Sequence, residues 1–163
     1  RQGSGLKVLA PGEADCIAIA GMGASTIISI LEDDMEVAQS AKLLVLQPMA
    51  GAASLRAWLC SHGWQLAAEE LVDDAPHFYE IIAAKRGLAP VYSAAECAVG
   101  PLLLAQEHPL LGKQLERQLA TCRQLVENMG RSERARASEK YKEIEALKAE
   151  LEVLQNGKRS DSK

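Results

Sequence analysis

Two short, continuous apolar runs in the first half of the chain predict β-strands buried in a sheet, over residues 14–20 and 42–46. Residues 64–72 and 77–84 predict two further strands on either side of an acidic turn. Because that turn is short, we expect this closing pair to add an antiparallel strand at the edge of the sheet.

Segments of helical periodicity lie between these strands. The first helix is expected to begin at Ser25 or Thr26, either of which can cap it, and to run to about Gln39. The second covers residues 52–62 and ends at Gly63. The positions expected to face the core are Ile27, Ile28, Ile30, Leu31, Leu55, Trp58 and Leu59. Apolar strands that alternate with helices are typical of a parallel α/β sheet, here the second half of a doubly wound domain.

The pattern changes after a mixed connector over residues 87–106. Apolar residues then return at steps of three and four on either side of a break at 130–132. They are Leu111, Leu115, Leu119, Cys122, Val126 and Met129, followed by Ile144, Leu147, Leu151 and Leu154. Two helices with matched apolar faces predict an antiparallel, coiled-coil-like α-helical hairpin. The expected organisation is a partial α/β domain over 1–100, the hairpin over 101–156 and a disordered tail over 157–163.

The composition and charge of the chain agree with an α/β fold followed by helices. The chain has 163 residues, of which 48% are hydrophobic and only 4% aromatic, which suits parallel sheets and helices better than a β-sandwich. The net charge of −4 conceals a division, because residues 1–100 hold 6 basic and 12 acidic residues whereas residues 101–163 hold 12 and 10. A mildly basic hairpin is a weak indication of a polyanionic partner, and the charge alone favours the alternative of a solvated helical surface.

The cysteines and histidines narrow the class of protein further. The four cysteines form no Cys-x-x-Cys pair, which predicts buried free thiols in a reducing cytoplasm. The three histidines form no cluster with metal-ligand spacing, so no metal is expected. No signal peptide or apolar span of membrane length occurs, so no membrane association is expected. Because the chain begins with Arg1 rather than methionine, we expect the natural protein to be longer at its N-terminus.

Two glycines stand where the first strand meets the first helix, in the sequence Gly21-Met22-Gly23. Glycine costs backbone entropy, so either the close approach of a ligand or tight strand–helix packing is expected to require them. In a doubly wound fold ligands bind outside the carboxyl ends of the strands, which is where this turn is predicted to lie. A tight turn without any ligand remains an alternative, and Thr26 stands where a dinucleotide fingerprint has its third glycine.

An ordered set of short motifs along the chain resembles one known family. The motifs are Arg1-Gln-Gly-Ser-Gly-Leu6, Ala14-Asp-Cys-Ile-Ala-Ile-Ala-Gly-Met-Gly23, Leu44-Val-Leu-Gln-Pro48, Leu55-Arg-Ala-Trp-Leu59, Phe78-Tyr-Glu-Ile81 and Val99-Gly-Pro101. In this order they resemble the TrmK family of bacterial tRNA methyltransferases, which use S-adenosylmethionine to methylate N1 of adenine 22 in tRNA. The resemblance implies a Rossmann-like methyltransferase domain followed by a helical, coiled-coil-like domain.

The resemblance also implies a cofactor site for S-adenosylmethionine. Its expected residues are Gly3, Ser4, Gly5, Leu6, Ala20 and Gly21. The family's glycine-rich cofactor loop lies in an N-terminal part that has no counterpart in this chain, so we expect the chain by itself to be inactive. Ser4 stands where the family has aspartate, and a hydroxyl accepts or donates hydrogen bonds without the strength that a carboxylate's charge adds.

The expected wall between cofactor and target base is made of Gly21, Met22 and Gly23, with Gln47 and Pro48 beside it. Met22 is a candidate for packing on a flat ring, and Gln47 for hydrogen bonding to the base; ordinary core packing and a strand-end cap are their respective alternatives. The chain has Ala24 and Met49 where the family usually has glycine and often has asparagine.

The helical hairpin is the part expected to hold tRNA. The basic residues expected to contact phosphates are Lys113, Arg117, Arg131, Arg134, Arg136 and Lys140. Interspersed glutamates offer the alternative that these residues form ion pairs along the helix surface. For Tyr141 and Trp58, packing is expected in preference to stacking on bases.

Two other functions are consistent with parts of the pattern. The first is a non-catalytic module whose hairpin binds RNA or protein. The second is a fragment of a nicotinamide-dependent oxidoreductase, which would need an acidic residue about 20 positions after Gly21. Lys42 stands near that position, which argues against the oxidoreductase. The matched apolar faces also permit dimerisation, so the oligomeric state is left open.

Overall fold

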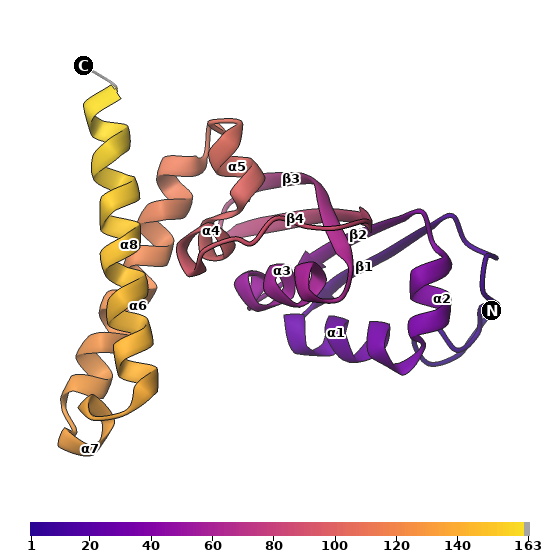
Figure 1. Ribbon diagram of the computed structural model, residues 1–163, viewed down its shortest axis with the longest axis horizontal. Coiled ribbons are helices and arrows are strands. Elements are labelled where there is room, and N and C mark those ends of the chain that lie inside the picture. Colours follow the sequence, from indigo (N-terminus) through magenta and orange to yellow (C-terminus); the bar gives the residue numbers. More distant parts are fainter. Residues whose placement is uncertain (162–163) are drawn as a thin grey trace.

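A four-stranded sheet is followed along the chain by a long helical hairpin (Figure 1). The structure is a computed structural model that describes residues 1–161. The elements are β1 (Cys16–Met22), α1 (Ala24–Asp33), α2 (Met35–Ser40), β2 (Leu43–Pro48), α3 (Ala52–Ser61), β3 (Trp64–Asp74), β4 (His77–Arg86), α4 (Ala94–Val99), α5 (Pro101–Ala105), α6 (Leu111–Gly130), α7 (Glu133–Arg136) and α8 (Glu139–Asp161).

The strands lie in the order β1-β2-β4-β3. Strands β1 and β2 are parallel, whereas β4 is antiparallel to both of its neighbours. All four predicted strands are therefore confirmed, but the antiparallel strand is not at the edge. Strand β4 lies inside the sheet because its second half pairs with β2, with Leu44 opposite Ala84 and Leu46 opposite Ile82, and the edge position falls to β3.

Helices α1 and α3 lie on one side of the sheet (Figure 1). The core between them and the sheet includes Ile27, Leu31, Leu44, Leu46, Leu55, Leu59, Trp64 and Ile82, each fully buried. On β1 the buried residues Ile17 and Ile19 alternate with the exposed residues Cys16, Ala18 and Ala20. Only one face of β1 is thus covered by the part of the chain that the structure describes, although its residues are apolar on both faces.

Two of the predicted helix boundaries differ from those in the structure. The first helix divides at Asp34, whose extended φ of −146° ends α1 before α2 begins. Its N-cap is Gly23 rather than Ser25 or Thr26, because the carbonyl of Gly23 already accepts the first helical hydrogen bond, from Ile27 N–H at 3.1 Å.

The connector contains two short helices that the sequence interpretation missed. Ser93 and Glu96 form a reciprocal capping box at the start of α4, and Pro101 occupies the first turn of α5. Both are known signals of a helix start, so the sequence did carry this information.

The helical hairpin is confirmed. Helices α6 and α8 lie side by side with α7 at their connection (Figure 1). The apolar positions predicted from the three–four spacing all belong to one core cluster that includes Leu115, Leu119, Ile144 and Leu151. Helix α8 continues to Asp161 and so includes residues 157–161, which were assigned to the disordered tail. Residues 162–163 of that tail lie outside the described residues.

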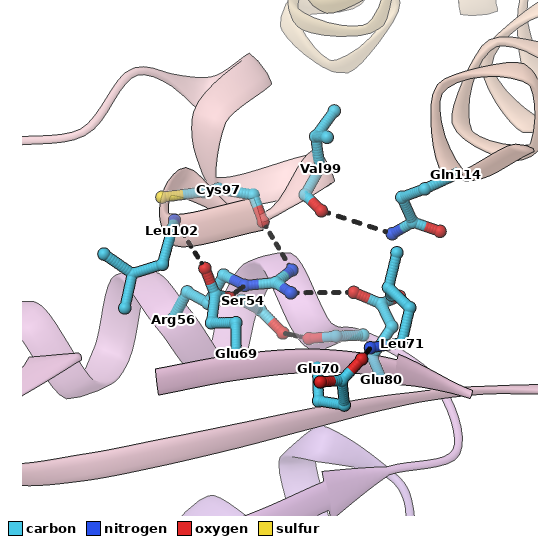
Figure 2. A network of polar contacts seen from close by, with 11 residues as sticks. Ser54, Arg56, Glu69, Glu70, Leu71, Glu80, Cys97, Val99, Leu102 and Gln114 are labelled. Carbon is cyan, nitrogen blue, oxygen red and sulfur yellow. Dashed lines mark hydrogen bonds and ion pairs between the residues drawn. The ribbon is translucent and has the colours of Figure 1, made fainter. Parts of the chain in front are cut away.

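A fully buried arginine connects the sheet to the helical part of the chain (Figure 2). The Nε of Arg56 donates to Glu69 at 2.5 Å, and its two terminal nitrogens donate to Glu80 at 2.8 Å and to the carbonyl of Cys97 at 2.9 Å. The second oxygen of Glu69 accepts from the backbone N–H of Leu102 at 2.8 Å. These bonds join α3, β3 and β4 to α4 and α5, which lead into the hairpin.

A second polar contact, between His108 and Glu70, predicts a pH effect. Leu110 N–H donates to His108 Nδ1, so the proton on Nε2 is the one that the imidazole donates to Glu70, at 2.6 Å. This bond, together with one from Leu71 N–H, lowers the pKa of the Glu70 carboxyl below its usual value of 4.5. A lowered pKa stabilises the folded state above the unfolded pKa, and that contribution is lost as the pH falls through the folded pKa.

We therefore expect His108→Leu to raise the pKa of Glu70 toward its usual value. The variant should be less stable than the parent near about pH 7, and the difference should shrink as the pH is lowered to about 3, toward the folded pKa of Glu70. A ¹³C NMR titration of the Glu70 carboxyl and urea unfolding at the two pH values measure these effects. An unchanged Glu70 titration in the variant would contradict the assignment.

Candidate functional site

The carboxyl ends of β1 and β2 are held together by three hydrogen bonds. Gly21 N–H donates to the side-chain carbonyl of Gln47 at 2.9 Å, and Met49 N–H donates to the carbonyl of Met22 at 2.8 Å. Ala24 N–H donates to the carbonyl of Ala50 at 2.9 Å. The segment 21–24 is therefore fixed against the segment 47–50 at the end of the sheet where open α/β folds bind ligands.

The backbone conformation at position 21 requires a glycine. Its φ of +76° lies in the left-handed region, and the pairing of β1 with β2 shifts register between Ala20 and Met22. A Cβ added at Gly21 or Gly23 would meet no described atom within 4 Å. Tight strand–helix packing is thus the wrong explanation for both glycines within the described chain, and Gly23 leaves open space at the helix start.

A groove of about 330 Å³ runs along the free edge of β1, on one side of this hydrogen-bonded end. Its lining is mainly apolar: Gly5, Leu6, Leu9, Ala14, Cys16, Ile17, Ala18, Ile19, Met22 and Ile30. The structure therefore brings two predicted cofactor residues, Gly5 and Leu6, together with Met22. The other predicted cofactor residues, Gly3, Ser4, Ala20 and Gly21, do not line this groove; all four are exposed.

A smaller pocket of about 170 Å³ lies on the other side, and we call it the junction pocket. It is lined by Gln47, Met49, Pro76, His77, Phe78, Tyr79 and Arg117. These residues come from the end of β2, the turn before β4, the start of β4 and helix α6. Gln47 and Arg117 were candidate site residues. His77 was predicted only as part of a strand, and Tyr79 only as part of that strand and of one family motif. Pro48, in contrast, is buried and lines neither hollow.

The predicted phosphate-binding residues do not form one patch. Lys113 and Arg117 lie near the sheet, and Arg134 and Arg136 lie in α7, beyond the end of α6, which is about 20–25 Å farther along the hairpin at 1.5 Å per helical residue. Several are paired with acids: Lys113 with Asp73 at 2.5 Å, Arg131 with Glu127 at 3.1 Å and Lys140 with Glu143 at 3.4 Å. Within the described chain, Arg117, Arg134 and Arg136 have no acidic partner within ion-pair distance and are exposed.

Trp58, which lies outside the junction pocket, packs against the core. Trp58 donates to Glu32 at 2.9 Å and stacks on the ring of His62, with centroids 4.4 Å apart. Among residues 1–161 there is no group of three or more histidines, cysteines or acids placed to hold a metal ion. No helix in the same range is long and apolar enough to cross a membrane.

Comparisons with known proteins identify relatives over nearly the whole chain. Residues 1–156 match the model of a family described as TrmK: tRNA (adenine(22)-N(1))-methyltransferase. The tRNA (adenine(22)-N(1))-methyltransferase of Bacillus subtilis is 30% identical over 159 residues, which are 94% of this chain and 66% of that protein. The chain thus spans slightly less than two thirds of the length of this curated relative.

Solved structures share the fold. The crystal structure of the Bacillus subtilis m1A22 tRNA methyltransferase TrmK superposes with a TM-score of 0.81 at 28% identity, over 95% of this chain and 69% of that one. The Streptococcus pneumoniae protein Sp1610, in complex with S-adenosyl-L-methionine, superposes with a TM-score of 0.76 at 26% identity, over 95% and 67%.

Proposed function

The chain belongs to the TrmK family, and from this membership we propose that it forms part of an enzyme that methylates N1 of adenine 22 in tRNA, with S-adenosylmethionine as methyl donor. One observation in the structure carries the proposal. The segments 21–24 and 47–50 are bound together at the carboxyl end of β1 and β2, between a groove on one side and a pocket on the other.

The residues of the groove fit the cofactor. When bound, S-adenosylmethionine supplies a methyl group on a sulfonium that a nitrogen lone pair can displace. The apolar lining at Leu6, Met22 and Ile30 suits the adenosine part of such a molecule, and Gly5 lets the backbone approach it. Gln47 and Met22 would then lie between donor and acceptor and orient them, which is the main task of a protein in such a displacement.

The acceptor nitrogen limits the form in which RNA can enter. N1 of adenine lies on the edge that pairs with another base, so the adenine must be unpaired or turned out of a helix before it reacts. We propose that Arg134 and Arg136, unpaired at the end of the hairpin, contact tRNA phosphates at a distance from this base.

We propose further that additional polypeptide completes the cofactor site along β1. The outer edge of β1 is unpaired within the described chain, and one of its apolar faces is uncovered. An apolar strand with a free edge pairs readily with another strand. The Bacillus subtilis relative, of which the chain spans 66%, contains polypeptide that the matched region does not account for.

A methyl-transfer assay on an enzyme assembled from two separate polypeptides tests the proposal. The chain is incubated with unmodified tRNA and radiolabelled S-adenosylmethionine, alone and with the unmatched segment of the Bacillus subtilis relative as a separate polypeptide. We expect label in N1-methyladenine only when both polypeptides are present. Complex formation without label on any tRNA would contradict the enzymatic function and favour a module whose hairpin only binds RNA or protein.

The reactivity of the Cys16 thiol is an independent measure of whether the added polypeptide binds along β1. The thiol is exposed on the uncovered face of β1, whereas Cys97 and Cys122 are buried and their burial raises the pKa of both thiols. We expect Cys16 to react first with a thiol reagent, and the added polypeptide to slow this reaction at least tenfold. Cys16→Ser should remove the fast phase. A rate that the added polypeptide leaves unchanged would show that it does not cover β1.

A further inference from the structure

We propose that the junction pocket binds one unpaired nucleobase of the RNA substrate, with the phosphate of the same nucleotide on Arg117. The inference rests on the proposed function, because it specifies where and how that substrate is held. It assigns RNA contacts to His77 and Tyr79, which lie at the start of β4, and it separates Arg117 from the basic residues at the far end of the hairpin.

The pocket contains two of the six aromatic side chains of the sequence. These are Phe78 and Tyr79, and they line the pocket together with the ring of His77. His77 and Tyr79 point to the same face of β4, with ring centroids 5.8 Å apart and planes tilted by 35°. Flat rings at the edge of a polar pocket are the usual platform for unpaired bases in RNA recognition.

The size of the pocket limits its occupant. At about 170 Å³ it is smaller than the pockets of roughly 300 Å³ or more that hold drug-sized ligands. It has room for several waters of about 30 Å³ each, and hence for one planar ring system. A single base fits this volume, whereas a stacked pair of bases or a folded peptide segment does not.

Arg117 supplies a cation whose hydrogen-bond donors are available. Its guanidinium lies 4.6 Å from the centre of the Phe78 ring, which positions the side chain without using its N–H groups. Lys113, one turn earlier, has its ammonium 2.5 Å from Asp73. Of the two cations beside Phe78, Arg117 is therefore the one that is free to pair with a phosphate.

Gln47 supplies a donor with a fixed orientation. Its carbonyl oxygen accepts from Gly21 N–H at 2.9 Å, so the amide nitrogen must point the other way. That nitrogen meets the sulfur of Met49 at 3.6 Å, and a thioether is only a weak acceptor. An NH₂ group on the pocket wall that has no strong acceptor among the described residues can donate to a ring nitrogen of a base.

Binding of adenosine 5′-monophosphate to the chain, followed by NMR, tests the inference without methyl transfer. We expect the ring signals of His77 and Tyr79 to shift, even if the backbone amide signals of Gly5 and Leu6 shift as well because the groove along β1 also suits adenosine. His77→Ala and Tyr79→Leu should each weaken binding about fivefold or more, as expected for the loss of one stacking partner. His77 is exposed, so its replacement leaves the core intact.

The phosphate contact is tested with paired ligands and a matched control. Arg117→Gln should weaken binding of adenosine 5′-monophosphate about tenfold and leave binding of adenosine unchanged. Arg123→Gln, which removes another exposed arginine of helix α6 that has no proposed role in RNA binding, should change neither. Equal losses for both ligands, or shifts confined to the groove along β1, would overturn the inference.

The outcomes separate this inference from the proposed function. Methylation of tRNA by the completed enzyme, without nucleotide binding at His77 and Tyr79, would overturn the proposed role of the junction pocket and leave the enzymatic function standing. Nucleotide binding in the pocket, without methylation of any tRNA, would overturn the enzymatic function and retain the pocket as an RNA-binding site.

Discussion

Arg56→Ala is expected to lower the free energy of unfolding by about 3–5 kcal/mol, the usual cost of breaking a buried ion pair by removing one partner. The substitution would leave the fully buried carboxylate of Glu69 without its cation and the carbonyl of Cys97 without a donor. Urea-induced unfolding followed by circular dichroism measures the loss. Because the same side chain connects the sheet to α4 and α5, amide hydrogen exchange in these helices should also accelerate.

A surface arginine provides the control for this prediction. Arg123 pairs with Glu152 at 3.5 Å with both side chains largely exposed, so Arg123→Ala should change stability by less than about 1 kcal/mol. Arg56→Lys should be intermediate or close to alanine, because an ammonium cannot reach Glu69, Glu80 and Cys97 in the planar arrangement that the guanidinium provides. Equal stability of the Arg56 and Arg123 variants would contradict the structural role of the buried network.

Gln47→Leu is expected to lower the turnover number of the completed methyltransferase about a hundredfold. The variant keeps the size of the side chain but loses both the acceptor for Gly21 N–H and the amide donor. Without that acceptor the bulge at Gly21 is free to move, and a displacement of about 1 Å at reacting groups can cost this much in rate. Steady-state kinetics with unmodified tRNA and S-adenosylmethionine, varied in turn, measure the effect.

Gln47→Glu separates the two roles of the amide. The carboxylate keeps an acceptor for Gly21 N–H but has no donor to offer a base, so its turnover number should lie between those of the parent and Gln47→Leu. The stability of each variant in urea shows whether the fold is intact. A leucine variant with the parent's turnover number would show that neither hydrogen bond matters for the reaction.

Much of the architecture followed from local pattern. The four strands and the complete apolar seam of α6 and α8 were predicted, because continuous apolar runs indicate buried strands, an acidic turn marks the closing strand pair, and spacing of three and four residues shows which side of a helix is buried. The helices α4 and α5 were missed although Ser93, Glu96 and Pro101 signal them, since each helix is too short to show a period. The roles assigned to the site residues remain predictions.

The sequence by itself determined the four strands, the helical hairpin, the family and the two segments that meet at the carboxyl end of the sheet. Tertiary structure alone decided that β4 lies inside the sheet, that Arg56 binds two acids 13 and 24 residues away, and that Arg117 comes to lie over Phe78. The reason is physical. Periodicity depends on neighbours a few residues apart, whereas these contacts depend on strand order and on how the helical hairpin packs against the sheet.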